Sequence, residues 1–470
     1  MSVNGHDRRQ RIRGAGRLLA SRLTLWALAK SGDPLSSLLR TGPGEDVYAL
    51  FERMRARGPV HRSRTGAYVV TSHALCNQVL RDPRFRVRDR HGRPADLDPS
   101  TSEGEDSMAG SFLEQDPPDH TRLRRLVAPA FRPKLVRGYR SRVEVVANDL
   151  LDRAARRGSF DLISDFAAPL PITVITELLG IPDVDVDRFA RLGAVVGHAI
   201  GGVFSARQAE ELQAANDELT AMFITLERGS RHEPGDDVLG ILAAARAEDR
   251  LTLEELVGAC GLLLIAGFET TVNLIGNAIV ALAGHPDQWQ LLGEEPSRAA
   301  AAVEETLRWD PPVQLTVRIP HEPVELAGHR VGPDAKVMLI LAAANRDPEV
   351  YPDPERFDIS RVPDAEHLAF SSGIHYCLGA QLARLEGEVA LQTLARRLPD
   401  LHLTGSLRRR PGSAIRGFAN VPLAALSPAG LARVDQHMPV GERHRSDSPL
   451  PSRSLHRTAK GGRPLKPTDA

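Results

Sequence analysis

Apolar residues recur along most of this chain with the three- and four-residue spacing of amphipathic helices. This spacing predicts helices over residues 47–58, 119–131, 135–156, 172–179, 206–227, 237–247 and 298–309. A longer apolar run predicts a buried helix over residues 253–283, and another helix is expected to end near Arg397. Strand patterns are confined to short segments, at residues 67–72 and within residues 317–342. The fold class is therefore expected to be mainly α with small β-sheets.

The chain is expected to hold one large domain. No segment within residues 41–425 has the composition of a linker, and no internal repeat is present. Residues 426–470 are rich in Pro, Ser, Gly and Arg, which predicts a disordered tail. Residues 1–40 are expected to form a basic N-terminal arm or extra helix, in which six arginines between Arg8 and Arg22 are interleaved with apolar residues.

The apolar stretch LTLWALA in the N-terminal segment does not predict a membrane span, because a span needs roughly 20 apolar residues. No small-residue cleavage site of a secretion signal accompanies it. A helix packed on the body or a frayed arm is the favoured interpretation. An amphipathic surface helix is the alternative.

Composition excludes several classes of protein. Lys plus Arg total 60 and Asp plus Glu total 60, so no global charge favours nucleic acid or a membrane. Cys76, Cys260 and Cys377 are far apart and odd in number, which excludes a disulfide framework. No CxxC or Cys/His cluster indicates structural zinc. The expected location is a reducing cytoplasm.

One cysteine lies in an unusual context. Cys377 stands between Gly373 and Gly379, just ahead of a predicted helix. The N–H groups at the start of that helix would favour a thiolate, which suits ligation of a soft metal such as heme iron. Taken alone, the residue fits a buried structural cysteine better than a ligand.

The wider stretch FSSGIHYCLG closely resembles the heme-ligand signature of the cytochromes P450, the heme-thiolate monooxygenases. The positions that match are Phe370, Gly373, His375, Cys377 and Gly379. Ser371 stands where glycine is commoner. The resemblance implies heme b with Cys377 as its axial ligand, Phe370 packed near the sulfur, and His375 bonded to a propionate. It implies the family's fold, with heme between the long central helix and the cysteine loop and helix.

The stretch EETLRW places Glu305 and Arg308 on one helix face. Seen alone, they fit a surface ion pair of little consequence. In the family, this ExxR pair is buried and joined by an arginine from a later loop. That loop resembles ANRDPEVYPDPERFD, which assigns Arg356 as the third member. A carboxylate shared by two guanidinium groups would brace the ligand loop.

The long apolar helix contains a polar triplet, ETT. Threonines in a buried helix can be accommodated by hydroxyls that hydrogen-bond to carbonyls one turn earlier. The buried Glu269 is explained less easily in this way. The stretch resembles the family's oxygen-activation motif. The matching positions are Ala266, Gly267, Glu269, Thr270 and Thr271. The resemblance implies that small residues open a groove over the heme, that Thr270 hydrogen-bonds dioxygen, and that Glu269 helps to relay protons.

Three basic residues match family positions that bind the heme propionates. His120 and Arg124 lie four residues apart in DPPDHTRLRRLVAPAF, and Arg318 follows the ExxR helix. Without the resemblance, the first two would fit a solvated basic helix. The resemblance extends from Asp46 to Pro422, and its four motifs keep the family's order and spacing.

The resemblance also assigns a substrate pocket, which is mainly apolar and suits a hydrophobic or amphipathic substrate. The pocket residues are Leu262, Ile265, Ala266, Val313, Gln314, Leu315 and Phe418. Residues 91–115 and 195–204 would form a lid. The acidic lid residues are Asp96, Asp98, Glu103, Glu105 and Asp106. They fit a solvated loop better than a site for a cationic substrate such as an amino-sugar macrolide.

The resemblance implies a cytoplasmic, monomeric monooxygenase that hydroxylates or epoxidises a small hydrophobic secondary metabolite, a polyketide (such as a macrolide) or terpenoid, with dioxygen. Such products include antibiotics. Electrons would come from NAD(P)H through a separate reductase and ferredoxin, which could dock on the basic residues Arg122, Arg125 and Arg132. Glu269 and Thr270 argue against a peroxide-driven enzyme. A non-catalytic heme protein, either a gas sensor or a helper in a biosynthetic complex, is the alternative. No partner nucleic acid and no membrane span are expected.

Overall fold

The computed structural model describes residues 20–42, 44–95, 110–181, 186–200, 205–230 and 237–424. Residues 20–30 are helical. The other helices are α2 (Pro34–Leu38), α3 (Val47–Arg55), α4 (His73–Arg81), α5 (Asp119–Val127), α6 (Pro133–Gly138), α7 (Arg140–Ala155), α8 (Pro169–Leu179), α9 (Val186–Ile200), α10 (Ala206–Ser230), α11 (Val238–Ala247), α12 (Leu253–Ala283), α13 (Pro286–Glu294), α14 (Ala299–Trp309), α15 (Leu341–Ala344) and α16 (Ala380–Arg397).

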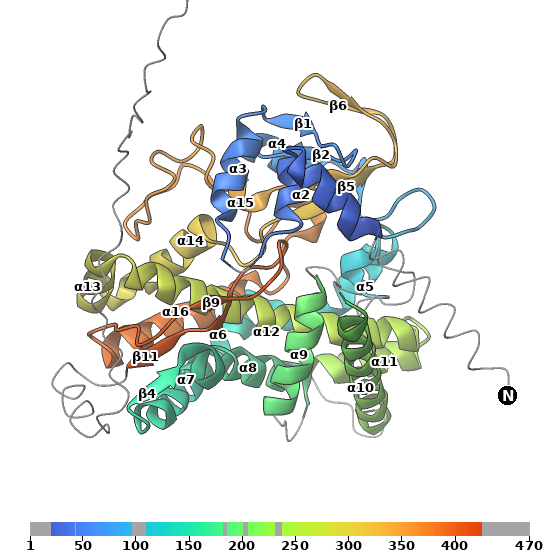
Figure 1. The fold of residues 1–470 in the computed structure, drawn as a ribbon. Helices are drawn as coiled ribbons and strands as arrows, with labels where there is room; N and C mark the ends of the chain where they lie inside the picture. The colour runs from blue at the N-terminus through green and yellow to red at the C-terminus, as the bar shows by residue number, and fades with distance from the viewer. Residues whose placement is uncertain are drawn as a thin grey trace, which may run out of the picture. The chain divides into compact units, whose positions relative to one another are not determined.

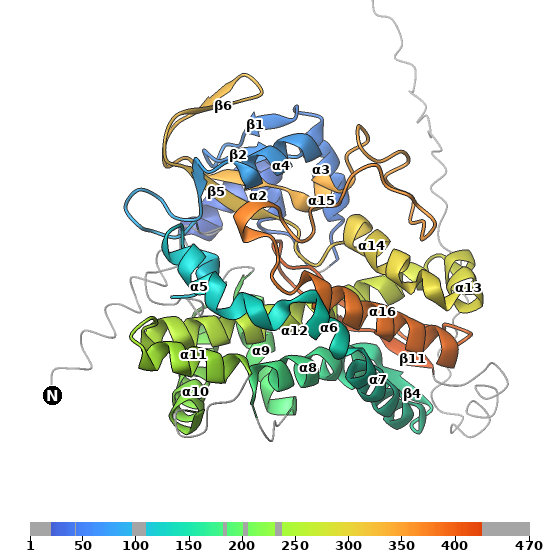
Figure 2. The same cartoon turned by 180° about the vertical axis from the view of Figure 1, so that it is seen from behind.

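Helix α12 forms the centre of the helical layer and packs against α8, α9, α14 and α16 (Figure 1). It begins at a capping box, in which the Thr252 hydroxyl accepts from the Glu255 N–H and the Glu255 carboxylate accepts from the Thr252 N–H. Apolar side chains surround most of the helix, so it is buried on nearly every side. Seen from behind, α5 and α6 lie on the side of α12 and α16 that faces the viewer (Figure 2).

The strands form small sheets. They are β1 (Val60–Arg62), β2 (Tyr68–Val70), β3 (Phe85–Arg86), β4 (Ser159–Asp161), β5 (Thr316–Pro320), β6 (Val324–Leu326), β7 (His329–Val331), β8 (Val337–Leu339), β9 (Arg408–Arg409), β10 (Phe418–Asn420) and β11 (Pro422–Ala424). Five of the described strands make one sheet in the order β1-β2-β8-β5-β3, in which only β2 and β8 are parallel. The remaining described strands pair as β6 with β7, β9 with β10 and β4 with β11.

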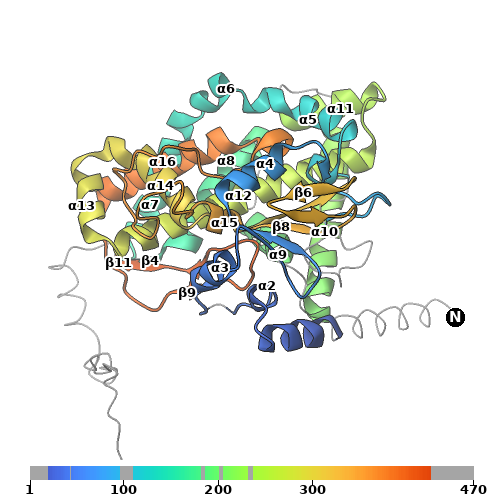
Figure 3. The ribbon, with the colours of Figure 1, turned by 90° about the horizontal axis from the view of Figure 1, so that it is seen from above.

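The five-stranded sheet lies with α2, α3, α4 and α15 on one side of the helical layer (Figures 1 and 3). Two hydrophobic clusters flank this sheet, one beneath α2 and α3 and one beneath α4. A much larger cluster fills the helical layer. The turn at Gly373–His375, ahead of α16, packs against α4 on the sheet side.

The mainly helical fold with small sheets agrees with the expected fold class, and α12 spans the predicted range. The segment predicted as one helix over 135–156 is two helices, because α6 ends at Gly138 and α7 restarts at Arg140. Helices α4, α9 and α13 were not predicted. Helices α4 and α13 have only nine residues each, whereas α9 has 15 residues and a clear amphipathic pattern that the sequence analysis missed. The acidic lid residues 96–106, most of the N-terminal arm and the tail from 426 lie outside the described residues.

One described helix, α12, is long and apolar enough to cross a membrane by length and composition. Its most apolar window is 83% buried inside the protein, as expected for a core helix.

Asp33 fastens the start of α2 to the turn between β1 and β2. Its fully buried carboxylate accepts from the N–H and hydroxyl of Ser36, from the Ser63 hydroxyl and from the Arg64 N–H, at 2.7–3.1 Å. Burial alone would raise the pKa of this carboxyl. The hydrogen bonds from Ser36, Arg64 and Ser63 outweigh burial, so its pKa lies below the ordinary value.

Asp33→Ala is expected to lower the free energy of unfolding at neutral pH by about 2–3 kcal/mol, because it leaves buried donors without an acceptor. Because the folded pKa is depressed, the stabilisation exists above the unfolded pKa and is lost as the pH falls through the folded one. Urea unfolding at several pH values should show the gap between the two proteins shrinking in acid. Equal stability at neutral pH would contradict the assigned role.

Candidate active site

Cys377 lies directly before α16, in a loop held by backbone hydrogen bonds. Its N–H donates to the Phe370 carbonyl at 2.9 Å, and the N–H of Gly379, the N-cap of α16, donates to its sulfur. Burial raises the pKa of the Cys377 thiol, while the Gly379 N–H and the nearby Arg124 and Arg384 oppose that rise. The side chain is half-buried, whereas Cys76 and Cys260 are fully buried. Among the three thiols, only Cys377 meets both an opening and stabilising donors.

The loop needs two left-handed residues. Ser371 has φ of 63° and Gly373 has φ of 68°. A Cβ on Gly373 would lie 2.3 Å from the Leu80 carbonyl oxygen at the end of α4, so only glycine fits there. Ser371 tolerates the left-handed region at some cost in conformational energy, which explains why glycine is the commoner residue at that position.

Helix α12 carries the second segment expected at the heme site. Ala266 is exposed and Thr270 is half-buried, within a helix that is otherwise mostly buried. The Thr270 hydroxyl donates to the Ala266 carbonyl at 2.8 Å, and Thr271 donates to the Gly267 carbonyl at 3.2 Å. The hydroxyls thus take the local bonds considered above, and the Thr270 oxygen keeps its acceptor capacity toward the opening.

Glu269 points into a different environment from Thr270. Its carboxylate is 2% exposed and forms an ion pair with Arg410, and the Asn273 amide donates to it at 3.3 Å. Arg410 is fixed in turn, because its Nε donates to the Phe418 carbonyl at 3.2 Å. The second Glu269 oxygen is buried without a partner. The acid expected to serve a proton relay is therefore held by an arginine that the sequence motifs did not indicate.

Four basic side chains gather beside the cysteine loop. The His120 and His375 rings lie 4.4 Å apart between centroids, and both His120 nitrogens and Nε2 of His375 are buried without a partner. The pKa of His375 is lowered to about 2, mainly by burial and then by the neighbouring Arg318, His120 and Arg124. Burial also lowers the pKa of Arg318 to about 10. Within the described residues, no anionic side chain contacts the buried, unpartnered nitrogens of His120 and His375 in this cluster of His120, Arg124, Arg318 and His375.

The ExxR pair is buried, but its third member is not the one predicted. Arg308 makes a two-pronged ion pair with Glu305, with both N···O distances at 2.7 Å. Arg361, not Arg356, completes the cluster, with its Nε 3.3 Å from a Glu305 oxygen. The Arg356 side chain is 65% exposed and pairs with Asp358 at 3.5 Å. Arg356 contributes its carbonyl instead, which accepts from both Arg308 and Arg361.

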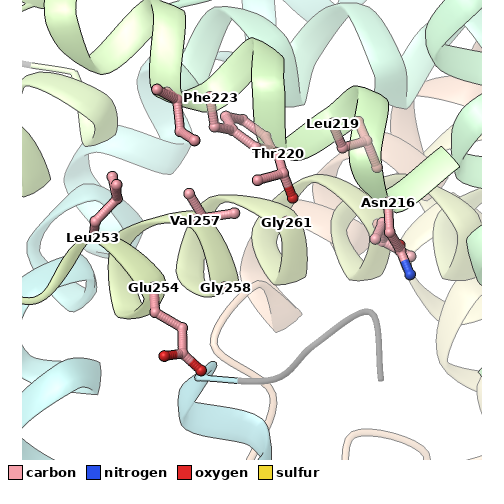
Figure 4. A pocket seen from close by; sticks show the side chains of 11 residues that line it. Asn216, Leu219, Thr220, Phe223, Leu253, Glu254, Val257, Gly258 and Gly261 are labelled. Carbon is pink, nitrogen blue, oxygen red and sulfur yellow. The ribbon is translucent and has the colours of Figure 1, made fainter. Parts of the chain in front are cut away.

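A cavity of about 490 Å³ lies between α10 and α12 (Figure 4). Its walls are mostly apolar, and they include Leu219, Thr220, Phe223, Val257, Gly261 and Ile265. Of the residues assigned to the substrate pocket, Ile265 lines this cavity. Leu262, Leu315 and Phe418 are buried, Val313 is half-buried, and the Gln314 amide donates to the Pro311 carbonyl. The structure does not gather all of them around one described cavity.

Comparison with known proteins decides the family. A family model described as Cytochrome P450 matches residues 204–399. The cytochrome P450 monooxygenase PikC of Streptomyces venezuelae is 42% identical over 390 residues, covering 80% of this chain and 91% of PikC. The chain belongs to the bacterial cytochrome P450 family. It is an oxidoreductase of the monooxygenase type.

Two further relatives widen the comparison for this P450. The vitamin D(3) 25-hydroxylase of Pseudonocardia autotrophica is 38% identical, and the alignment covers 84% of this chain and 98% of the relative. The solved structure of the P450 PksS of the bacillaene polyketide synthase, from Bacillus subtilis 168, matches with a TM-score of 0.72. That match has 32% identity and covers 81% of this chain and 97% of the other.

The family's cofactor is heme, iron protoporphyrin IX, and the residues of this P450 fit it. The half-buried Cys377 sulfur offers one soft ligand, while exposed Ala266 leaves room beside an otherwise buried helix. The two propionates of a heme would supply the anions that the basic cluster of His120, Arg124, Arg318 and His375 lacks. Phe370 is buried next to this loop, with Arg384 stacked 4.6 Å from its ring centre.

The two arginines of the ExxR loop provide a matched pair of variants. Arg361→Ala is expected to lower the free energy of unfolding by about 1–3 kcal/mol, because part of the buried Glu305 carboxylate loses its partner. Arg356→Ala should change it by less than about 0.5 kcal/mol, since that side chain is exposed and its carbonyl remains. Denaturant unfolding of the heme-loaded variants measures both. The reverse order of effects would restore Arg356 as the third member.

Proposed function

We propose that this P450 inserts one oxygen atom from dioxygen into a C–H or C=C bond of a hydrophobic or amphipathic secondary metabolite, of the polyketide or terpenoid type. The observation that carries the proposal is that one fold contains both a half-buried Cys377 in a strained loop and an exposed Ala266 next to a half-buried Thr270 in the otherwise mostly buried α12. A merely structural cysteine would need neither the left-handed loop nor an exposed position in the central helix.

The proposed substrate class has two supports. The cavity between α10 and α12 is large and mostly apolar, which suits a molecule of drug size rather than a small polar metabolite. One relative is a vitamin D(3) 25-hydroxylase, and another is the P450 PksS of the bacillaene polyketide synthase. These similarities favour a bulky, largely apolar substrate for this protein.

In the proposed assignment, Cys377 ligates the heme iron, and His120, Arg124, Arg318 and His375 bind the propionates. When bound, the heme supplies activation of dioxygen and transfer of one oxygen atom to the substrate. Thr270 is oriented by its bond to the Ala266 carbonyl, so its oxygen can accept and pass a proton at the opening.

Glu269 is the proposed acid behind Thr270, one residue earlier in α12. In the described conformation Arg410 neutralises its carboxylate and Asn273 adds a hydrogen bond, so it is held in place without contact to solvent. Proton transfer by Glu269 therefore requires that its carboxylate exchange Arg410 for another partner. This role stands as a proposal on the motif and the burial.

Electrons are proposed to come from a separate ferredoxin with its NAD(P)H-dependent reductase. Arg125 and Arg132 are exposed at the end of α5 and just beyond it, on the side of the cysteine loop, where they suit an acidic partner. Arg122, also expected there, instead forms ion pairs with Asp119 and Glu255. Its charge is thus largely balanced within the chain.

Cys377→Ala tests thiolate ligation. The wild-type protein, reduced and bound to carbon monoxide, is expected to show the strongly red-shifted Soret band of thiolate-ligated heme. The variant should lose both that band and substrate turnover, because no other described thiol meets an opening. Cys260→Ala, which alters a buried thiol in the body of α12, serves as the control and should keep the band. A variant at 377 that keeps the red-shifted band would reject the assignment.

Thr270→Ala tests the proton role. The variant should bind heme normally but release reducing equivalents as hydrogen peroxide, so that product formed per NAD(P)H falls by about tenfold or more. Thr225→Ala is a matched control, because Thr225 makes the same 2.8 Å bond to a carbonyl four residues earlier, on the exposed face of α10. Product yield and peroxide are measured together. Unchanged coupling in Thr270→Ala would count against the assigned role.

A further inference from the structure

The helix over residues 20–30 presents apolar side chains to solvent. Leu23 is 58% exposed and Trp26 is 48% exposed, and Ala27 beside them is also exposed. These positions and Lys30 follow one another at i, i+3, i+4 and i+7, so they lie on one side of the helix. We refer to Leu23, Trp26, Ala27 and Lys30 as the N-terminal face.

The turn that ends the helix bearing this face is bonded to the rest of the protein. The Asp33 N–H donates to the Leu28 carbonyl at 3.1 Å, and Arg57 donates to the Gly32 carbonyl at 2.7 Å. Asp33 then fixes α2, whose Leu35 and Leu38 are fully buried. The helix lies beside α2 at the periphery of the described residues (Figure 3). Its exposed apolar side chains are therefore a feature of an anchored helix.

The stretch of sequence that contains the face is strongly basic. Residues 1–32 contain one acid, Asp7, and seven basic residues. The basic residues are Arg8, Arg9, Arg11, Arg13, Arg17, Arg22 and Lys30. Since basic and acidic residues balance over the whole chain, the remaining residues carry an excess of acid. Basic charge is thus concentrated in the segment that exposes a leucine and a tryptophan.

We propose that the N-terminal face docks on the surface of an anionic lipid bilayer and holds the enzyme there peripherally. Leucine and tryptophan suit the boundary between headgroups and acyl chains, where the indole has an apolar body and an N–H donor. Arginine and lysine beside them are attracted to anionic headgroups, and this attraction weakens as salt is added. A hydrophobic substrate of the kind proposed above would concentrate in the same bilayer.

Two other occupants fit the face less well. A second copy of the chain would bring two strongly basic segments together, and the face offers far less apolar area than the roughly 800 Å² per partner of a stable dimer. An acidic protein would be expected to use a groove or pocket for the tryptophan. The cavity between α10 and α12 includes no residue of this helix, and neither does a second pocket lined by α5 and residues 246–255.

The test uses the full-length, heme-loaded protein and sedimentation with two kinds of vesicle. One kind is pure phosphatidylcholine, and the other contains an equal part of phosphatidylglycerol. Binding is expected only to the anionic vesicles, with loss in high salt and a blue shift of tryptophan fluorescence. The double variant Leu23→Gln, Trp26→Gln should bind about tenfold more weakly or worse. Val145→Gln, at a 51% exposed apolar residue of α7, is the control and should bind like the wild type.

Several results of the vesicle test would overturn the proposal. Equal binding to both kinds of vesicle, no binding to either, or full binding by the double variant would each overturn the proposal. Dimerisation that the double variant abolishes, without vesicle binding, would assign the face to a second copy. The carbon monoxide spectrum should be unchanged in both variants, so failure of this proposal is distinguishable from failure of the monooxygenase assignment.

Discussion

The buried carboxylate of Glu305 is the point on which the cysteine loop depends. It accepts from Arg308, from Arg361 and from the Asp358 N–H, so that a charge with almost no exposure has several donors. Isolated buried ion pairs often add little stability, because desolvation offsets their attraction. Here the remaining guanidinium N–H groups donate to backbone carbonyls. The cluster thereby holds a long irregular segment that belongs to no helix or strand.

Asn345 connects this cluster to the loop that carries Cys377. Arg308 donates to the Asn345 carbonyl, and the Asn345 side chain bonds to the Leu307 carbonyl and to the Leu368 N–H. Leu368 lies two residues before Phe370, whose carbonyl accepts from the Cys377 N–H. Hydrogen bonds, joined by the backbone of residues 368–370, therefore connect α14 to the cysteine. Residues that do not touch the thiol thus help to hold the loop that carries it.

The sequence motifs predicted the central helix, the cysteine loop and the buried ExxR pair, because each combines strong periodicity with unusual residues at fixed spacing. They gave the wrong third arginine. Arg356 and Arg361 both lie in a loop without periodicity, where only tertiary contacts decide which side chain turns inward. Arg410 could not be found either, since it is 141 residues from Glu269 and lies directly after the two-residue strand β9. The need for glycine at 373 depends on the approach of α4, which no local pattern reveals.

The β9–β10 hairpin has a mechanical consequence. Arg409 stacks on Phe418, with its guanidinium carbon 4.2 Å from the ring centre, while Arg410 is bonded both to the Phe418 backbone and to the Glu269 carboxylate. A ligand that pushes Phe418 aside would thus pull on the arginine that immobilises Glu269. Displacement of Phe418 and release of the Glu269 carboxylate are thus coupled through Arg409 and Arg410.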